Sequence, residues 1–536
     1  MAKEDSKNRV IFNAFSMALG TLSSRVLGLM REVLLTAYFP RMITDAWTVA
    51  FRLPNLFRRI LGEGSLSVSF IPVFVEAQQN SPERSQNLMN GVYTLLLLVL
   101  SLLTAFGIVF TEFFIDLMLH ENYELVPGKI ELTYRMARIM FGFLFFISNY
   151  AFFMGILNAL GSFGLAAMAP TLFNISMIIS TIIPDHYFSY SGDGLAWGVL
   201  IGGALQMLIL VPALQRKNYL PKVQWDILRI LRNPDVKKVF LNMLPGLFGL
   251  GLLQITTLVN QHFASQLGEG VITYIYLADR LLELPLSLIS VSLGVALLPM
   301  LSSLWSRNEK QQMSETTAFY LRLNLYMVSA AAVGLFMLAR PIIEVLFQHG
   351  KFTAQDVKVT VEVVGIWALI MVPSSLVRVL APAYYAVKNT WLPAAVSLIC
   401  LVIHLVVAPV LIKNFGLMGL NSSSLLSSSL NMILLLICYN KFIYSLSFSE
   451  IFRKISLFSV PLGAMGFVLY FYGYVEAIAY EHFSGYGYLV KLVLLIAFIF
   501  AGLLTFGGTS AAMGLEESKV TTERVLGKLK RRIGRK

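Results

Sequence analysis

Long apolar runs follow one another along the whole chain, and their apolar positions are continuous instead of alternating. A run of about 20 apolar residues is the length that an α-helix needs to cross a bilayer. Strands of a membrane barrel would instead alternate with a period of two. The pattern therefore predicts an all-α integral membrane protein with about fourteen transmembrane helices. The expected spans are 10–39, 45–76, 88–110, 134–160, 165–183, 195–214, 239–264, 271–305, 318–346, 357–387, 392–412, 417–443, 451–475 and 488–513.

The first two spans carry charged residues that a lipid environment disfavours. An arginine near the bilayer centre costs about 2.5–3.5 kcal/mol even on lenient insertion scales. A chain that keeps several charges at this depth must pair them or place them in a water-filled cavity. We therefore expect the arginines of these spans to line an internal cavity that receives an anion. The charged residues are Arg25, Arg31, Glu32, Asp45, Arg52, Arg58, Arg59 and Glu63.

The second span is polar on one face and interrupted near its middle. The polar residues fall at helical spacing on one face: Asp45, Arg52, Asn55 and Arg59. Pro54 predicts a kink in the helix, and the sequence Gly62-Glu63-Gly64 predicts a break. Interrupted spans of this kind mark binding sites in transporters. A plain helix–loop–helix without a binding role is the alternative.

Composition supports the membrane assignment and excludes other classes. Hydrophobic residues make up 57% of the chain and charged residues 13%, against about 25% charged in soluble proteins. The net charge of +12 does not indicate a nucleic-acid partner, because no soluble domain is left to carry a reading motif. Lysine and arginine instead gather in the loops on the side of both termini, which predicts cytoplasmic termini. Cys400 and Cys438 lie in apolar runs without metal-ligand spacing.

Two short segments of the first half recur in the second half at nearly one offset. Ser65–Pro72 resembles Ser292–Pro299, 227 residues later, and Ile115–His120 resembles Ile343–His349, 228 residues later. The shared offset indicates two halves of about six helices each that cross the membrane in the same direction, a known transporter plan. The predicted domains are an N-terminal lobe (1–215), a basic cytoplasmic linker (216–238), a C-terminal lobe (239–445), two extra helices (446–513) and a basic cytoplasmic tail (514–536).

The second half carries its own charges at the position that corresponds to the polar second span. Asp279 and Glu283 lie one helical turn apart, and Arg280 can reach Glu283 at the i+3 position. A self-neutralised ion pair within this group is the alternative to a cavity role. Against that alternative, arginines at this depth outnumber the nearby acids: Arg25, Arg31, Arg52 and Arg280.

Arginine is the side chain suited to forked recognition of phosphate. Several arginines in one low-dielectric cavity repel each other when the cavity is empty and relax when a diphosphate enters. An anion that bridges the halves would also favour closure. A cationic drug would require an acid-rich cavity, which the sequence lacks. No G-x-x-x-x-G-K-[ST] motif is present, so the chain does not use ATP as its energy source.

Six segments resemble the MurJ/MviN family of bacterial lipid II flippases, within the multidrug/oligosaccharidyl-lipid/polysaccharide exporter superfamily. The resemblance implies two lobes, with two extra helices that help to form a groove for the lipid tail. It also implies alternating access that carries lipid II, the undecaprenyl-diphosphate-linked disaccharide peptide, from the inner to the outer leaflet of the bacterial inner membrane for cell-wall synthesis. The segments are Ser24–Glu32, Thr44–Phe74, Leu157–Asn174, Ala278–Pro285, Phe347–Thr353 and Leu380–Pro393.

The same resemblance implies roles for individual residues. Arg25, Arg31 and Arg280 match cavity arginines that are expected to engage the diphosphate. Asp45 matches an acid near the outer gate, and we expect it to pair with a cavity or gate arginine in one state. Further cavity or gate positions are Ser24, Arg52, Asn55, Arg58, Arg59, Glu63, Asp279 and Glu283.

Coupling, partners and rival functions complete the expectations. Some members of the family use sodium held by carboxylates, but the expected helices seven, eleven and twelve contain no acid here. No cofactor is expected, and membrane potential or a monovalent cation would drive transport. Expected partners are lipid II, phospholipid, and the cell-wall synthesis and division machinery. The rivals are export of another lipid-linked oligosaccharide or a drug, a membrane glycosyltransferase and a non-transporting scaffold.

Overall fold

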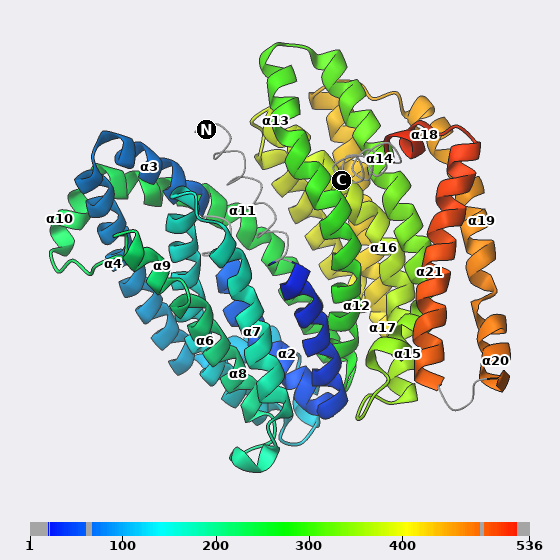
Figure 1. The fold of residues 1–536 in the computed structure, drawn as a ribbon, viewed down its shortest axis with the longest axis horizontal. Coiled ribbons are helices and arrows are strands. Elements are labelled where there is room, and N and C mark those ends of the chain that lie inside the picture. The colour runs from blue at the N-terminus through cyan, green and yellow to red at the C-terminus, as the bar shows by residue number, and fades with distance from the viewer. Residues whose placement is uncertain (1–19, 21, 60–66, 483–486, 522–536) are drawn as a thin grey trace, which may run out of the picture. The chain divides into compact units, whose positions relative to one another are not determined.

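The computed structural model describes residues 20, 22–59, 67–482 and 487–521 (Figure 1). These residues form helices joined by turns, and the described part of the chain contains no strand. The predicted all-α fold class is confirmed. Ten helices within this part are long and apolar enough to cross a membrane.

The remaining expected spans also have helical backbone. One of the ten helices, α17 (Trp391–Phe442), covers two expected spans, which meet at Gly416, where the backbone is not helical (φ 55°, ψ −129°). Three expected spans are not among the ten. Helical backbone at those spans is described for residues 22–38, for α2 (Arg41–Phe57) with α3 (Ser67–Asn80), and for α11 (Pro234–Ser265). The predicted break at 62–64 lies outside the described residues.

The chain divides into two compact units, Met1–Thr273 with His349–Phe352, and Tyr274–Gln348 with Thr353–Lys536. The first unit holds residues 22–38 and the following helices: α2, α3, α4 (Pro82–Val109), α5 (Thr111–Met118), α6 (Lys129–Ala159), α7 (Gly164–Ile182), α8 (Asp193–Leu208), α9 (Val211–Arg216), α10 (Ile227–Arg232) and α11. The units divide at Thr273, whereas the predicted lobes meet at the linker, residues 216–238. The units therefore do not test the predicted lobe boundaries, which stay a prediction.

Helix α12 (Val271–Leu286) begins in the first unit and continues into the second. A π-helical turn (Ser287–Val291) joins it to α13. The other helices of the second unit are α13 (Ser292–Ser306), α14 (Lys310–Met337), α15 (Ala339–Phe347), α16 (Ala354–Ala386), α17, α18 (Phe448–Ser456), α19 (Ser459–Tyr470), α20 (Tyr472–His482) and α21 (Gly487–Ala512).

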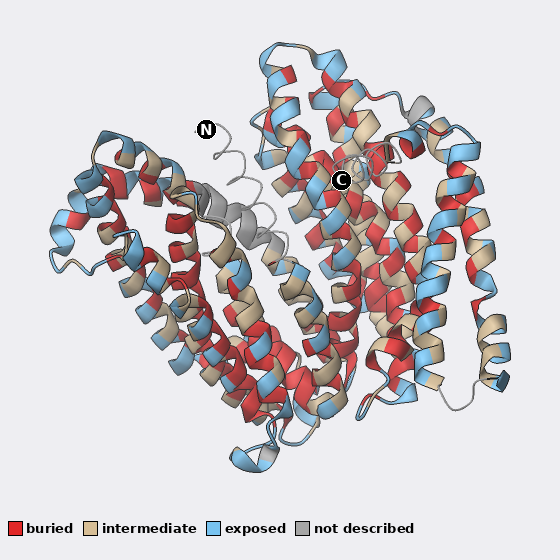
Figure 2. Cartoon of the chain, in the orientation of Figure 1, coloured by how far each residue is buried: buried red, intermediate tan, exposed pale blue. Residues whose placement is uncertain are grey.

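Helix α6 is the central helix of the first unit and packs against α2, α4 and α8. It is largely buried, in contrast to the exposed faces of α4 (Figure 2). Glycines permit close packing here. A Cβ at Gly203 of α8 would lie 2.5 Å from the Phe143 ring of α6, and one at Gly202 would lie 2.8 Å from the Phe173 ring of α7. Small residues at helix contacts let membrane helices approach each other closely.

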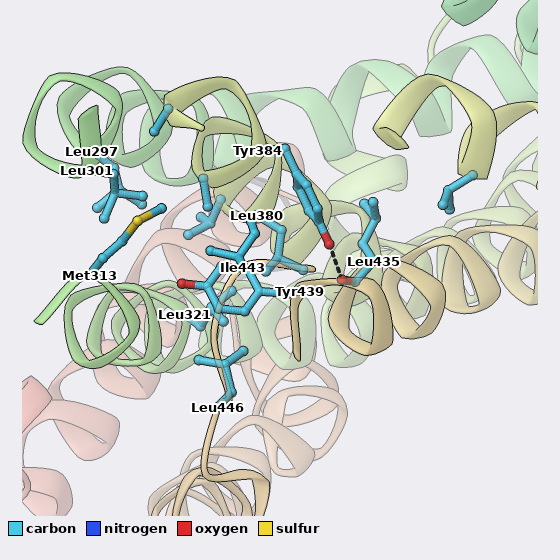
Figure 3. Close-up of a cluster of buried hydrophobic side chains, with 14 of the residues drawn as sticks. Leu297, Leu301, Met313, Leu321, Leu380, Tyr384, Leu435, Tyr439, Ile443 and Leu446 are labelled. Carbon is cyan, nitrogen blue, oxygen red and sulfur yellow. Dashed lines mark hydrogen bonds between the residues drawn. The ribbon is translucent and has the colours of Figure 1, made fainter. Parts of the chain in front are cut away.

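The second unit has a core between α13, α14, α16 and α17, drawn in Figure 3. Leu297, Leu301 and Met313 are fully buried in it, and the Tyr384 hydroxyl donates a hydrogen bond to the carbonyl oxygen of Leu435. This bond satisfies a polar group that would otherwise be stranded in an apolar core. A second core includes Met465 of α19 and Phe506 of α21, so the two extra C-terminal helices pack on their own unit.

Irregular backbone of one kind occurs at similar places in the two halves. Residues 58–59 have π-type backbone at the end of the second span, and the π-helical turn of the second half begins at Ser287, 229 residues after Arg58. Single π-turns inside helices occur frequently at functional sites. This spacing is close to the repeat offsets of 227 and 228, and the repeat itself stays a prediction.

Candidate functional site

Arg31 is the buried arginine of the first helix. It is 6% exposed, and its Nη1 donates to Asn174 Oδ1 over 3.0 Å. Its Nη2 is paired with the carboxylate of Glu32, and its guanidinium lies 5.6 Å from the centre of the Phe173 ring. A buried guanidinium needs such partners, because desolvation of an unpaired charge is costly.

Asn174 of α7 links two positions of the first helix. Its Oδ1 accepts from Arg31, while its Nδ2 donates to the backbone carbonyl of Ser24 over 2.8 Å and to the Ser24 hydroxyl over 3.4 Å. Both ends of the amide are used, so its orientation is fixed. Asn174 thereby brings two predicted site residues together. Arg25 lies on the same helix and is partly exposed.

Asp45 of α2 is fully buried and accepts four hydrogen bonds. Its Oδ2 accepts from Lys129 Nζ (2.8 Å) and the amide of Gly270 (2.7 Å). Its Oδ1 accepts from the amide (2.9 Å) and hydroxyl (2.7 Å) of Thr273. We define these four residues as the Asp45 cluster. Its basic member is Lys129, not the arginine that we expect in one state.

The rest of the second span is held by amides. Arg52 Nε donates to Gln261 Oε1 of α11 over 2.7 Å, and Arg58 Nε donates to Asn55 Oδ1 over 2.9 Å. Arg59 is exposed. Glu63 lies outside the described residues. With Asp45, five predicted residues of this span therefore have a described place, and Arg52 is anchored to a different helix.

In the second unit, Arg280 lies against an aromatic ring. Its guanidinium is 4.8 Å from the centre of the Tyr276 ring, and Nη2 donates to the Tyr276 hydroxyl over 3.1 Å. Glu283 is bonded to Arg378 of α16, at 3.2 Å and 3.0 Å. Asp279 is partly exposed.

Two charged residues of these networks, Arg378 and Lys129, were missed from the sequence. Arg378 is a charged residue inside an apolar span, and that same feature identified Arg25, so the sequence could have identified Arg378 as well. Lys129 follows an acidic loop and looks like a loop residue in sequence. Only the fold shows that it is buried.

An ion pair outside the expected spans connects two helices near the linker. Arg84 donates to both oxygens of Asp235, each over 2.7 Å. This hydrogen bonding to Arg84 lowers the pKa of Asp235 below its ordinary value, although partial burial acts in the opposite direction. The pair joins the start of α4 to the start of α11. Within the described residues, no group of three or more His, Cys, Asp or Glu side chains could hold a metal ion.

Comparison with known proteins bears on this arrangement. A family model described as "Lipid II flippase MurJ" matches residues 35–498. A protein of Bdellovibrio bacteriovorus named as a probable lipid II flippase MurJ is 49% identical over 517 residues, covering 96% of this chain and 97% of that protein.

Solved structures agree on the fold. One of lipid II flippase MurJ in an inward closed conformation has a TM-score of 0.72 at 23% identity and covers 91% of this chain and 98% of its own. An inward-facing MATE family multidrug resistance transporter of the MOP superfamily has a TM-score of 0.66 at 14% identity, covering 80% and 96%. At these identities the two structures show the fold alone.

Proposed function

Because this chain belongs to the lipid II flippase family MurJ, we propose that it carries lipid II from the inner to the outer leaflet of the bacterial inner membrane by alternating access. It is a transporter, not an enzyme, and serves peptidoglycan synthesis. The observation that carries the proposal is Arg31, a buried cation inside the first expected span with a carboxylate, Glu32, beside it. An anionic head group is the ligand that could replace this internal counter-ion.

The diphosphate of lipid II is the anion proposed for the site. Arg25, Arg31 and Arg280 bind it, since arginine presents a forked set of donors to phosphate oxygens. Asp45, Arg52 and the charged end of the second span act in gating. Glu283 belongs with them, together with its partner Arg378. A cationic drug fits less well, because arginines outnumber acids among the charged residues of the first two spans.

Arg31→Ala tests the proposal. In cells depleted of the native protein, lipid II should disappear from the outer leaflet. The wild type should restore it, and Arg31→Ala should not. Arg138→Ala removes a half-exposed arginine of the same unit that pairs with Glu112, and it should rescue fully. Unchanged outer-leaflet lipid II on depletion, without a redundant flippase, would point to another lipid-linked substrate. Rescue by Arg31→Ala would place the anion elsewhere.

Energy coupling and surroundings complete the proposal. Transport is driven by membrane potential or by a monovalent cation. Flipping rates in proteoliposomes, with an imposed potential or a cation gradient alone, separate the two. Both termini, the linker and the basic tail lie on the cytoplasmic side. Lipid II and phospholipid are the molecular partners. The enzymes that make and consume lipid II in cell-wall synthesis and division are the expected protein partners.

A further inference from the structure

A buried lysine lies beside a buried carboxylate in the first unit. Lys129 is 1% exposed and Asp45 is 0% exposed, and the two are joined by the 2.8 Å hydrogen bond described above. The ammonium also lies 4.3 Å from the centre of the Tyr123 ring. Lysine is almost never fully buried unless it is paired. Helix packing alone does not require such a pair, since apolar residues of similar volume often serve as well or better.

The same carboxylate holds the first turn of α12. The amides of Gly270 and Thr273 and the Thr273 hydroxyl all donate to Asp45. A helix begins with amides that have no intrahelical partner, and a carboxylate placed there satisfies them and interacts favourably with the helix dipole. Asp45 therefore has two sets of donors, Lys129 on α6 and the start of α12.

The two sets of donors come from different halves of the sequence repeat. Thr273 follows Asp45 by 228 residues, which is the repeat offset, whereas Lys129 follows it by 84. After Thr273, α12 leaves the first unit and carries Arg280. At the corresponding place in the second half, the uncharged hydroxyl of Tyr274 donates to Asp356 at the start of α16.

We propose that Lys129 is a positioning residue for transport, the fixed counter-ion that keeps Asp45 paired when the first turn of α12 releases it. The proposal rests on the alternating-access function above. In the closed arrangement of the Asp45 cluster, Asp45 accepts from both sets of donors, as in this structure. In the open arrangement the α12 turn has moved away and Lys129 alone remains. Opening then leaves no uncompensated charge.

Opposite effects follow for the two members of the pair. Lys129→Met makes Asp45 depend on α12 alone, so the closed arrangement gains population. Asp45→Asn gives α12 a weaker, neutral acceptor, so the open arrangement gains population. If the pair had a purely structural role, either change would lower the stability of the fold, and the two changes would not shift the populations in opposite directions. The double variant Asp45→Asn/Lys129→Met buries no charge, so it should regain stability without regaining transport.

Spin labels can read the two arrangements directly. Glu121→Cys and Glu269→Cys place labels at exposed positions of the first unit, in a background with Cys400→Ser and Cys438→Ser. Double electron–electron resonance in lipid nanodiscs gives the ratio of closed to open populations. Lys129→Met should raise this ratio about tenfold and Asp45→Asn should lower it by a similar factor, within the usual range of such couplings. Lys351→Met, an exposed lysine of the same unit, should leave it unchanged.

Shifts in the same direction for Lys129→Met and Asp45→Asn, or no shift for Lys129→Met, would overturn the proposal. Should Lys129→Met fail to fold, the double variant decides: transport at the wild-type rate overturns the proposal, and folded protein without transport supports it. The distance measurement needs no lipid II. If the two variants show the expected shifts but the wild type does not flip lipid II, the proposed function is overturned. The role inferred for Lys129 in the Asp45 cluster then still holds.

Discussion

At the scale of single residues, the charges within the spans have defined neighbours. Arg31 is held by Glu32 and Asn174, Arg52 by Gln261, and Arg280 by Tyr276. Of these partners only Glu32 carries a charge. A ligand that reaches Arg31 must compete with that carboxylate, and a diphosphate brings more negative charge than one carboxylate does. We therefore expect selection for diphosphates over singly charged head groups.

Asn174 positions this site, and its removal should slow transport. Asn174→Ala removes one hydrogen bond from the Arg31 guanidinium and the bond to the Ser24 carbonyl. Because misplacement of a binding group by about 1 Å can cost up to a hundredfold in rate, we expect lipid II flipping in vesicles to fall about tenfold or more. Lipid II flipping per reconstituted protein is the measurement.

Asn414→Ala is the matched control, since Asn414 is an exposed asparagine whose amide bonds only to the Val410 carbonyl of its own helix. It should flip lipid II at the wild-type rate. Equal rates for Asn174→Ala and the wild type would show that the first helix positions Arg31 without help from α7.

The sequence could identify the buried arginines but not their partners. Arg31 stands out because charge is rare in an apolar run, which is a local property. Its partner Asn174 is 143 residues away, and Lys129 is 84 residues from Asp45. Those pairings depend on how helices pack, which one sequence does not show. Arg378 is the exception, since the same local criterion would have found it.

At the scale of elements, helix positions were predictable because the hydrophobicity of each span can be read from its own residues. The two spans within α17 were separated correctly, and the structure places non-helical backbone at Gly416 between them. The membership of α12 was not predictable from hydrophobicity. Its first three residues join the first unit through Asp45, and its remaining residues belong to the second.

The turn before α16 contains a close backbone contact that the hydrophobicity of the sequence does not predict. Gly350 has φ +55°, and a Cβ there would lie 2.1 Å from the carbonyl oxygen of Ala37, which accepts from the amide of Lys351. Gly350→Ala should destabilise the first unit by about 1–3 kcal/mol, the usual cost of a strained backbone residue, with the steric clash added. Thermal unfolding in detergent should show a lower Tm.

Gly463→Ala provides the comparison for this change. Gly463 lies within α19, and a Cβ there would meet nothing within 4 Å. Alanine is the better helix former by about 1 kcal/mol, so the Tm should stay equal or rise. A Tm for Gly350→Ala as high as the wild type would mean that the contact with Ala37 does not hold this turn.

At the scale of the whole molecule, the linker predicts which loops of the chain face the cytoplasm. Trp225 is 91% exposed, and Leu228 and Leu231 are also exposed. Arg229 lies between the two leucines and Arg232 directly follows Leu231 on α10, and both arginines are exposed. Large apolar and aromatic side chains next to basic ones are typical of a segment that lies in the membrane interface. Because anionic lipid is concentrated in the cytoplasmic leaflet, we expect α10 to lie on that leaflet.

Two measurements check this placement. Arg229→Cys should react with a membrane-impermeant maleimide only after the cells are opened, whereas Glu121→Cys, on the opposite side, should react in intact cells. The Trp225 contribution to fluorescence, taken as the difference from Trp225→Phe, should be quenched by brominated lipid in vesicles. Labelling of Arg229→Cys in intact cells would reverse the topology. It would also place the basic linker on the side where the positive-inside rule disfavours it.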